Sequence, residues 1–308
     1  MINLHKLEKT GSSPISLPDL SSLDAITRQL PDGYYSTFRT YDGCTRVLGL
    51  TAHLQRLYDP VSTPEITDSV LRRQLLSLLQ PFRPDEARVR VMMTKQGQVY
   101  VAMEPLRILA HEIYENGVRV ETTEIQRNNP RLKSTAFISA SESERKHIAQ
   151  EGIFEALLVK NGRILEGMTS NFFYILRAER RDEGSLRSVD EARGLLPMRA
   201  SSAEPQTAFG SSAQRDVIVT AQRDILLGVT RRTVIRLARG RGVEVKYQAL
   251  KLNQVLDLNE AFITSSSRGI VPVIQIDHVT IGQGRPGQIT RMLIAAYNEY
   301  VFEHAEKI

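Results

Sequence analysis

The sequence contains very little cysteine, with Cys44 the one such residue among 308. A single thiol can neither close an intramolecular disulfide nor build a thiolate cage, so disulfide-rich folds and thiolate metal sites are excluded. Histidine is also sparse, and no two of the six histidines have the spacing of a metal-ligand pair. We therefore predict no metal site and a reducing compartment.

Long apolar runs are missing as well. No run reaches the roughly 18 residues of a membrane span, and residues 1–17 lack the apolar segment of a signal peptide. The 40 basic residues barely exceed the 35 acidic ones, and much of the excess is arginine scattered over residues 176–242. Because no basic stripe with interleaved aromatics is present, we expect a soluble, cytoplasmic protein without a nucleic-acid or membrane partner.

Strand and helix patterns alternate along the chain, and 308 residues suffice for about two domains. In the first part we predict a hairpin of strands 34–41 and 44–50, amphipathic helices up to Pro81, and strands at 87–94, 98–103 and 118–125. The polar, proline-containing segment 126–132 is the best boundary. We predict an α+β fold with mixed β-sheets flanked by helices: a small α/β domain over 1–125, an interdomain loop over 126–132 and a larger domain over 133–308.

One segment of the larger domain has no sustained periodicity. Residues 177–214 mix Arg, Glu, Ser, Ala and Gly. An unpatterned stretch of this length predicts a long solvated insertion rather than a third domain.

Four segments are difficult to explain by packing alone. Lys133 stands between the boundary loop and a helix, either as a solvated lysine or as a partly desolvated amine that attacks a carbonyl. Glu166 is followed by Gly167 and a run containing small polar residues, which is either a β-bulge or an unusual way to continue a hairpin. Thr230 follows Gly228 at a helix start, where free amides bind phosphate or are simply capped. Residues 264–267 are hydroxyl residues at a strand end, which form an anion cradle or a solvated turn.

In this order along the chain, and together with Tyr35–Gly43 and His53–Leu57, these segments resemble the class IV aminotransferases. This is the fold-type IV pyridoxal-phosphate family of branched-chain and D-amino-acid aminotransferases and aminodeoxychorismate lyase. The resemblance covers about residue 29 to the C-terminus. It implies a two-domain fold, pyridoxal 5′-phosphate as cofactor and a homodimer.

The resemblance also implies roles for single residues. Lys133 would form the Schiff base with the cofactor and move the substrate proton, and Glu166 would face the pyridine nitrogen. The phosphate would be held by Arg56, by the amide of Val229, and by Thr230 and Ser266. The substrate would be bound by a further set: Tyr35, Arg88, Arg90, Ser267 and Arg268.

The sequence departs from the family pattern in two places. Where branched-chain enzymes bond the cofactor's ring oxygen with a tyrosine, this chain has Phe137, so another donor is required. The N-terminal strands of the family look replaced by Ser12–Leu30. Alternation puts Arg88 and Arg90 on one face of a strand. That face is either exposed to solvent, or it faces the cleft, in which case the two arginines favour substrates with a second carboxylate.

These observations favour an aminotransferase acting between an L-amino acid, including branched-chain substrates, and 2-oxoglutarate. The alternative is aminodeoxychorismate lyase, which uses the same cofactor to eliminate pyruvate. A non-catalytic binding protein is disfavoured because Lys133, Glu166 and Arg56 are retained together.

Overall fold

The computed structural model describes residues 2–177 and 216–308, and all structural statements below concern these residues. The predicted insertion at 177–214 lies outside them, apart from Arg177.

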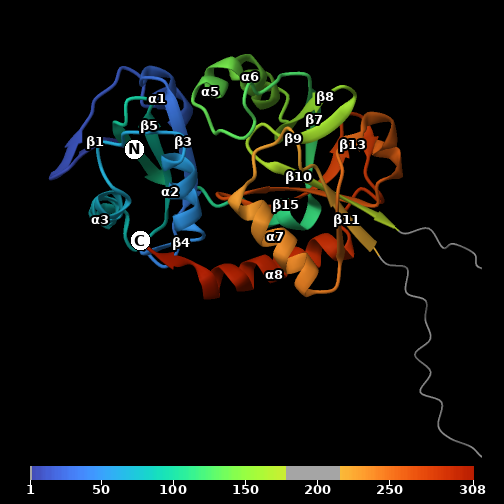
Figure 1. Ribbon diagram of the computed structural model, residues 1–308. Coiled ribbons are helices and arrows are strands. Elements are labelled where there is room, and N and C mark those ends of the chain that lie inside the picture. Colours follow the sequence, from blue (N-terminus) through green and yellow to red (C-terminus); the bar gives the residue numbers. More distant parts are fainter. Residues whose placement is uncertain (1, 178–215) are drawn as a thin grey trace, which may run out of the picture.

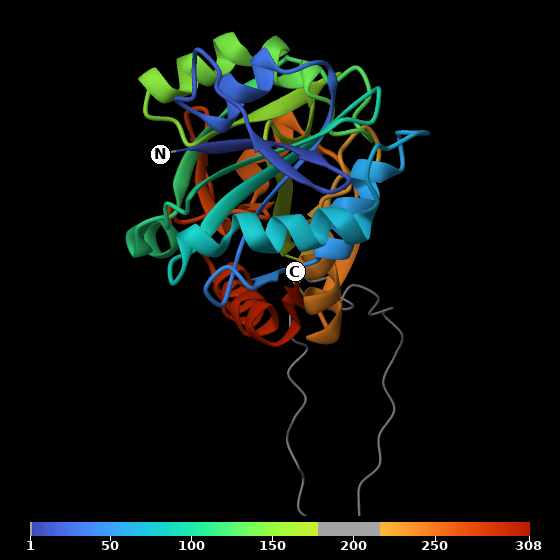
Figure 2. The same cartoon turned by 90° about the vertical axis from the view of Figure 1, so that its left-hand side faces the viewer.

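A five-stranded antiparallel sheet forms the first part of the molecule, in the order β2-β1-β6-β5-β3 (Figure 1). Its strands are β1 (Asn3–Glu8), β2 (Gly11–Pro14), β3 (Gly33–Arg39), β5 (Ala87–Thr94) and β6 (Val99–Pro105). Helices α2 (Leu50–Tyr58) and α3 (Asp68–Leu78) cover one face, and the 3₁₀ turn Gln80–Phe82 follows α3 (Figure 2). Helix α1 (Leu23–Gln29) packs on the other face.

Side chains alternate along β5, so this strand contributes to the packing on both faces of the small sheet. Val89 and Val91 are buried in the core beneath α2 and α3. Met92 packs with α1 on the opposite face, to which Arg88 and Arg90 also belong. The prediction that the two arginines share a strand face is therefore confirmed.

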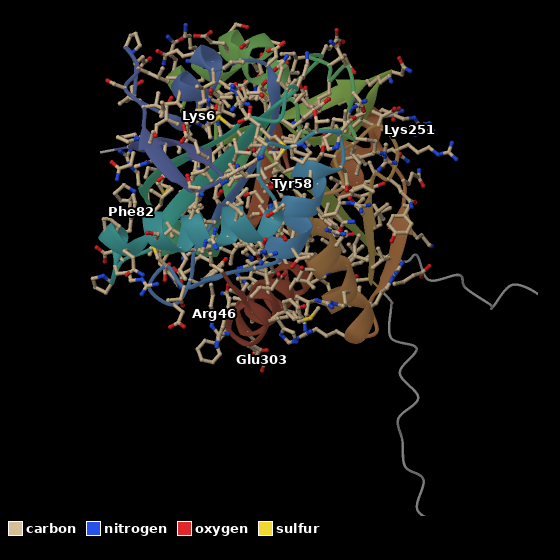
Figure 3. The ribbon with its side chains drawn as sticks, turned by 60° about the vertical axis from the view of Figure 1, so that its left-hand side comes forward. Lys6, Arg46, Tyr58, Phe82, Lys251 and Glu303 are labelled. Atoms are coloured by element: carbon tan, nitrogen blue, oxygen red, sulfur yellow. The ribbon has the colours of Figure 1, made fainter. Side chains whose placement is uncertain are left out.

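Two local predictions are wrong. The family's N-terminal strands are not replaced, since β1 pairs with β6 and α1 follows within Ser12–Leu30. The returning strand at 44–50 is only the two-residue β4 (Arg46–Val47), because Cys44 and Gly49 have left-handed backbones that turn the chain into α2. Strand β4 pairs with the C-terminal β17 (Glu306–Lys307), and Arg46 Nη1 donates to the Ala305 carbonyl at 3.2 Å. Figure 3 labels Arg46 of β4 and Glu303, near the end of α8.

A ten-stranded mixed sheet forms the second part, in the order β12-β11-β10-β14-β15-β7-β8-β9-β13 with β16 beside β15. The strands are β7 (Val118–Thr123), β8 (Glu155–Lys160), β9 (Arg163–Gly167), β10 (Asn171–Arg177), β11 (Asp216–Thr220), β12 (Glu244–Tyr247), β13 (Leu250–Lys251), β14 (Glu260–Ser265), β15 (Gly269–Ile276) and β16 (Val279–Thr280).

Helices flank this large sheet. Helices α7 (Val229–Gly240) and α8 (Gln288–His304) bury their apolar sides on β10, β11 and β14, and α8 runs back toward the small sheet (Figure 1). The others are α4 (His111–Asn116), α5 (Ala136–Ala140), α6 (Glu142–Gln150) and the 3₁₀ segment Leu252–Asp257. No helix in the described part of the chain is both long and apolar enough to cross a membrane.

The strand predicted at 118–125 was assigned to the wrong part of the molecule. As β7 it pairs in parallel with β8 and β15, so it belongs to the large sheet. Periodicity identified the strand but carries no information on its partners. The domain boundary at 126–132 stays a prediction.

The segment carrying Lys133 is bonded to the edge strand of the small sheet. The Tyr35 amide donates to the Lys133 carbonyl at 2.9 Å, and the Thr135 amide donates to the Gly33 carbonyl at 2.9 Å. The chain entering α5 is therefore fixed against β3, and Lys133 lies between the two sheets.

Candidate active site

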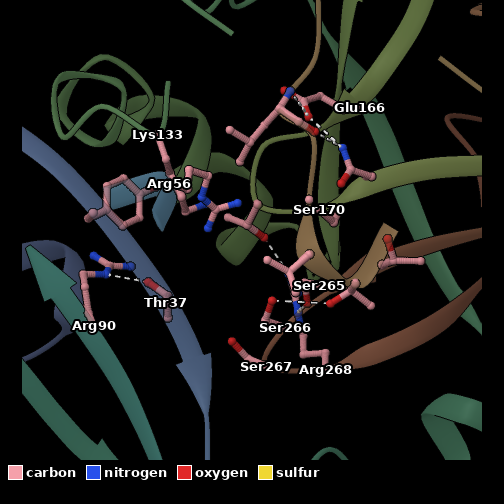
Figure 4. A pocket seen from close by; sticks show the side chains of 18 of the residues that line it. Thr37, Arg56, Arg90, Lys133, Glu166, Ser170, Ser265, Ser266, Ser267 and Arg268 are labelled. Carbon is pink, nitrogen blue, oxygen red and sulfur yellow. Dashed lines mark hydrogen bonds between the residues drawn. The ribbon is translucent and has the colours of Figure 1, made fainter. Parts of the chain in front are cut away.

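A cavity lies between the sheets, and its wall contains every site residue predicted from the sequence (Figure 4). The small sheet, α1 and α2 contribute Asp24, Tyr35, Thr37, Arg56, Arg88 and Arg90. The large sheet and the helices and loops around it contribute the other lining residues: Arg127, Lys133, Arg145, Glu166, Thr169, Ser170, Asn171, Leu226, Gly228, Val229, Thr230, Thr264, Ser265, Ser266, Ser267 and Arg268.

Lys133 carries the nucleophilic amine of this cavity. Its Nζ lies 4.7 Å from the centre of the Tyr35 ring. Loss of hydration lowers the Lys133 pKa to about 8; Tyr35 opposes this shift, and the positive charges of Arg56 and Arg127 add to it. At pH 7 about a tenth of the amine is therefore unprotonated and able to attack a carbonyl, far more than for a lysine with an ordinary pKa.

Glu166 is a buried carboxylate at the end of β9, opposite Asn171 in the ladder. Its Oε2 accepts hydrogen bonds from Asn171 Nδ2 and from the Leu226 amide, each at 3.0 Å. Burial raises the Glu166 pKa to about 7, against the nearby charge of Arg127. Its Oε1 lies 3.0 Å from Arg127 Nε but has no properly aligned hydrogen bond among the described residues. This oxygen can therefore accept a hydrogen bond from the protonated nitrogen of a ligand's ring.

The start of α7 forms a cradle for an anion. The first amides of a helix have no acceptor within it, and Val229 and Thr230 occupy these positions. Thr230 Oγ1 lies 3.3 Å from Ser266 Oγ. A Cβ at Gly228 would collide with Asn171 Oδ1, so glycine allows the close approach of these segments.

Arg56 adds a positive charge from α2. Burial lowers its pKa to about 10, which leaves it cationic at neutral pH. Its Nη2 donates to Ser36 Oγ at 2.9 Å, and Ser36 Oγ lies 2.8 Å from His53 Nδ1. Burial holds the pKa of His53 well below its ordinary value, so the ring is neutral. Its Nδ1 can therefore accept a hydrogen bond from the Ser36 hydroxyl.

The class IV amino-transferase family model matches residues 33–276 of the chain. The chain belongs to this family. It is accordingly an enzyme of the pyridoxal-phosphate-dependent class IV aminotransferase family.

Its relatives carry several activities in their names. A Methanocaldococcus jannaschii protein provisionally named a branched-chain-amino-acid aminotransferase is 26% identical over 288 residues, covering 85% of this chain and 84% of its own. A Bacillus licheniformis D-alanine aminotransferase is 23% identical, covering 91% of each chain. A Bacillus subtilis aminodeoxychorismate lyase is 26% identical, covering 87% of this chain and 85% of its own.

The fold agrees with this assignment. A Thermotoga maritima structure, provisionally named a branched-chain amino acid aminotransferase, superposes with a TM-score of 0.70 at 23% identity, covering 97% of this chain and 96% of its own. The predicted two-domain α+β fold of fold type IV is therefore confirmed.

In this enzyme, Arg90 is already paired inside the protein. It donates to Asp24 Oδ1 at 2.7 Å, to the Leu23 carbonyl at 2.9 Å and to Thr37 Oγ1 at 3.0 Å. Arg145 Nη1 donates to Asp24 Oδ2 at 3.1 Å. The pKa of Asp24 is lowered because these arginines outweigh its desolvation. Of the two alternatives left open by the sequence, Arg90 thus faces the cleft, but it holds an internal carboxylate.

Two further arginines of the wall, Arg88 and Arg268, also have acidic partners. Arg88 Nη1 donates to Glu104 Oε1 at 3.0 Å. Arg268 Nη2 donates to Glu155 Oε2 at 3.1 Å. The positive charge of Arg88, Arg90, Arg145 and Arg268 is therefore largely balanced within the chain.

Sequence reasoning missed three charged residues of the wall: Asp24, Arg127 and Arg145. Asp24 and Arg145 belong to helices whose local patterns carry no sign of a site. Arg127 lies in the predicted boundary loop, where its place just before Lys133 was the one available signal.

Proposed function

We propose that the enzyme holds its cofactor on Lys133 and moves an amino group between an L-amino acid, branched-chain substrates included, and 2-oxoglutarate. The observation that carries this proposal is that the Lys133 amine, the Glu166 carboxylate and the anion cradle of α7 line one cavity. These three groups match the aldehyde, ring nitrogen and phosphate of pyridoxal 5′-phosphate.

When bound, the cofactor supplies an electron sink for the substrate's Cα electrons. Glu166 Oε1 retains the proton on the ring nitrogen, which keeps the sink effective. Arg56, the Val229 amide, Thr230 and Ser266 bind the phosphate. The Lys133 amine takes the proton from the substrate's Cα and returns it during transfer.

Charge in the outer cavity supports an anionic substrate. Four arginines (Arg88, Arg90, Arg145 and Arg268) pair with three carboxylates (Asp24, Glu104 and Glu155), which leaves one positive charge in excess. A dicarboxylate such as 2-oxoglutarate is attracted by this excess. Ser267 would hold the α-carboxylate through its amide, with Tyr35 alongside.

The aminodeoxychorismate lyase reaction is the second candidate. The similarity to a lyase of this name and the same positive excess favour it, because its substrate also carries carboxylates. The two reactions differ in whether the substrate loses pyruvate or its amino group.

The half-reaction tests the proposal directly. Adding L-glutamate or L-leucine to the holoenzyme should shift the visible absorbance to that of the amine form of the cofactor, and 2-oxoglutarate should restore it. If no L-amino acid changes the spectrum while aminodeoxychorismate releases pyruvate, the lyase assignment replaces it.

We also propose a homodimer, on the family resemblance. Sedimentation of a fully active monomer would contradict it.

A further inference from the structure

Arg127 has an unusual position in the cavity wall. Its side chain is only 5% exposed, and its Nη2 donates to the Met168 carbonyl at 2.6 Å. The guanidinium lies 3.8 Å from the ring centre of Phe137, the residue found where a tyrosine was expected. Nε of Arg127 lies 3.0 Å from Glu166 Oε1 as an ion pair without hydrogen-bond alignment, and Nη1 has no hydrogen-bond partner among the described residues.

Such an arrangement is incomplete by itself. A buried guanidinium carries five N–H donors, and leaving charged donors unsatisfied costs more than leaving neutral ones. Arg127 lines the same cavity as Lys133 and Glu166, and its charge acts on both groups. Its free donors are therefore available to a ligand held between those two residues.

The chemistry of the cofactor places a suitable acceptor there. In pyridoxal 5′-phosphate the ring carbon bearing the hydroxyl lies on the edge between the ring nitrogen and the aldehyde carbon. If Glu166 faces the nitrogen and Lys133 the aldehyde, as the proposed function requires, the hydroxyl oxygen lies on the edge they share.

We propose that Arg127 is the donor to the cofactor's ring oxygen in this enzyme, in place of the missing tyrosine hydroxyl. Phe137 supports it by offering a flat face to the guanidinium, and the Met168 carbonyl fixes its orientation. A charged donor stabilises the ionised ring oxygen more strongly than a neutral hydroxyl does.

The alternative is that Arg127 is purely structural and acts through Met168 and Glu166. The two roles are separated by measuring dissociation constants of the apoenzyme for pyridoxal 5′-phosphate and for 3-deoxypyridoxal 5′-phosphate, which lacks the ring hydroxyl. The proteins compared are the wild type, Arg127→Gln and the matched control Arg131→Gln. Arg131 is exposed, lies outside the cavity wall and donates to the Gln222 carbonyl at 2.9 Å.

If Arg127 bonds the ring oxygen, Arg127→Gln should raise the dissociation constant for pyridoxal 5′-phosphate about 10- to 100-fold. The constant for the deoxy analogue should change only a few-fold, and Arg131→Gln should change neither constant by more than about twofold. Equal weakening of both ligands by Arg127→Gln, or no weakening of either, would overturn the inference.

Circular dichroism of each apoenzyme establishes folding. If Arg127→Gln does not fold, Arg127→Lys takes its place, since an ammonium keeps the charge but cannot satisfy Met168 and the ring oxygen in the same planar fork. Arg127→Lys should weaken binding of pyridoxal 5′-phosphate much more than binding of the deoxy analogue. If it does not, the inference is again overturned. Failure of the proposed cofactor site looks different, because the wild type would then bind neither ligand at Lys133. Failure of the transaminase reaction alone would leave both dissociation constants unchanged.

Discussion

Replacing Gly228 by alanine tests the packing that joins the carboxylate site to the anion cradle. The backbone of Gly228 is compatible with alanine, with φ −64° and ψ 147°, so any effect is steric. The added Cβ would collide with Asn171 Oδ1. Asn171 Nδ2 bonds both Glu166 and the Leu226 carbonyl, at 3.0 and 2.7 Å, so displacing Asn171 disturbs both.

Overpacking of this kind typically costs about 1–3 kcal/mol, and the weakened bond to a buried carboxylate adds a comparable amount. We expect Gly228→Ala to lower the unfolding free energy by about 2–4 kcal/mol and to weaken cofactor binding at least tenfold. Urea denaturation of the apoenzyme and a cofactor titration measure the two effects.

Gly240, at the other end of α7, provides the matched control. Nothing lies within 4 Å of a Cβ built there. Gly240→Ala should therefore leave cofactor binding unchanged and stabilise the protein by about 0.5–1 kcal/mol through helix propensity. If Gly228→Ala is as stable as Gly240→Ala and binds the cofactor normally, the packing argument is refuted.

Three further predictions follow from the charges around the cavity. The rate at which apoenzyme combines with pyridoxal 5′-phosphate should rise about tenfold per pH unit below pH 8 and level off above it, because the unprotonated fraction of Lys133 increases up to its pKa of about 8; a flat profile in stopped-flow measurements would contradict the lowered pKa. Ser36→Ala removes the hydroxyl that accepts from Arg56 Nη2, so cofactor affinity should fall about tenfold in an absorbance titration; unchanged affinity would show that Arg56 needs no such support. Asp24→Asn removes the carboxylate paired with Arg90 and Arg145, so the KM for 2-oxoglutarate should fall about three- to tenfold while that for L-leucine stays constant; an equal change for both substrates would place Asp24 outside recognition of the second carboxylate.

Much of the local structure was predictable because it depends on short-range patterns. Periodicity located β5, β6 and α7, and residue order along the chain located Lys133, Glu166 and the α7 cradle, all of which line one cavity. Residues 136–150 form two helices, α5 and α6, divided at Ser141, whose hydroxyl donates to the Phe137 carbonyl at 2.6 Å. This side chain-to-backbone bond competes with regular helix and leaves no trace in the apolar spacing.

The rest depends on contacts between distant segments. The pairing of β7 with β8 and β15 is set by the assembled sheet, so the strand's own alternation could not assign it. Asp24 enters the site only because α1 packs on the small sheet next to Arg90. Arg145 reaches the same carboxylate from α6, more than a hundred residues later in the chain.

The most direct test of the central claim is chemical trapping of the cofactor on its lysine. Borohydride reduction of the holoenzyme, followed by proteolysis and mass spectrometry, should find the reduced cofactor on the peptide containing Lys133, and Lys133→Ala should abolish the adduct. An adduct on another lysine, or none with cofactor in excess, would contradict the assignment of Lys133 as the residue that carries the chemistry.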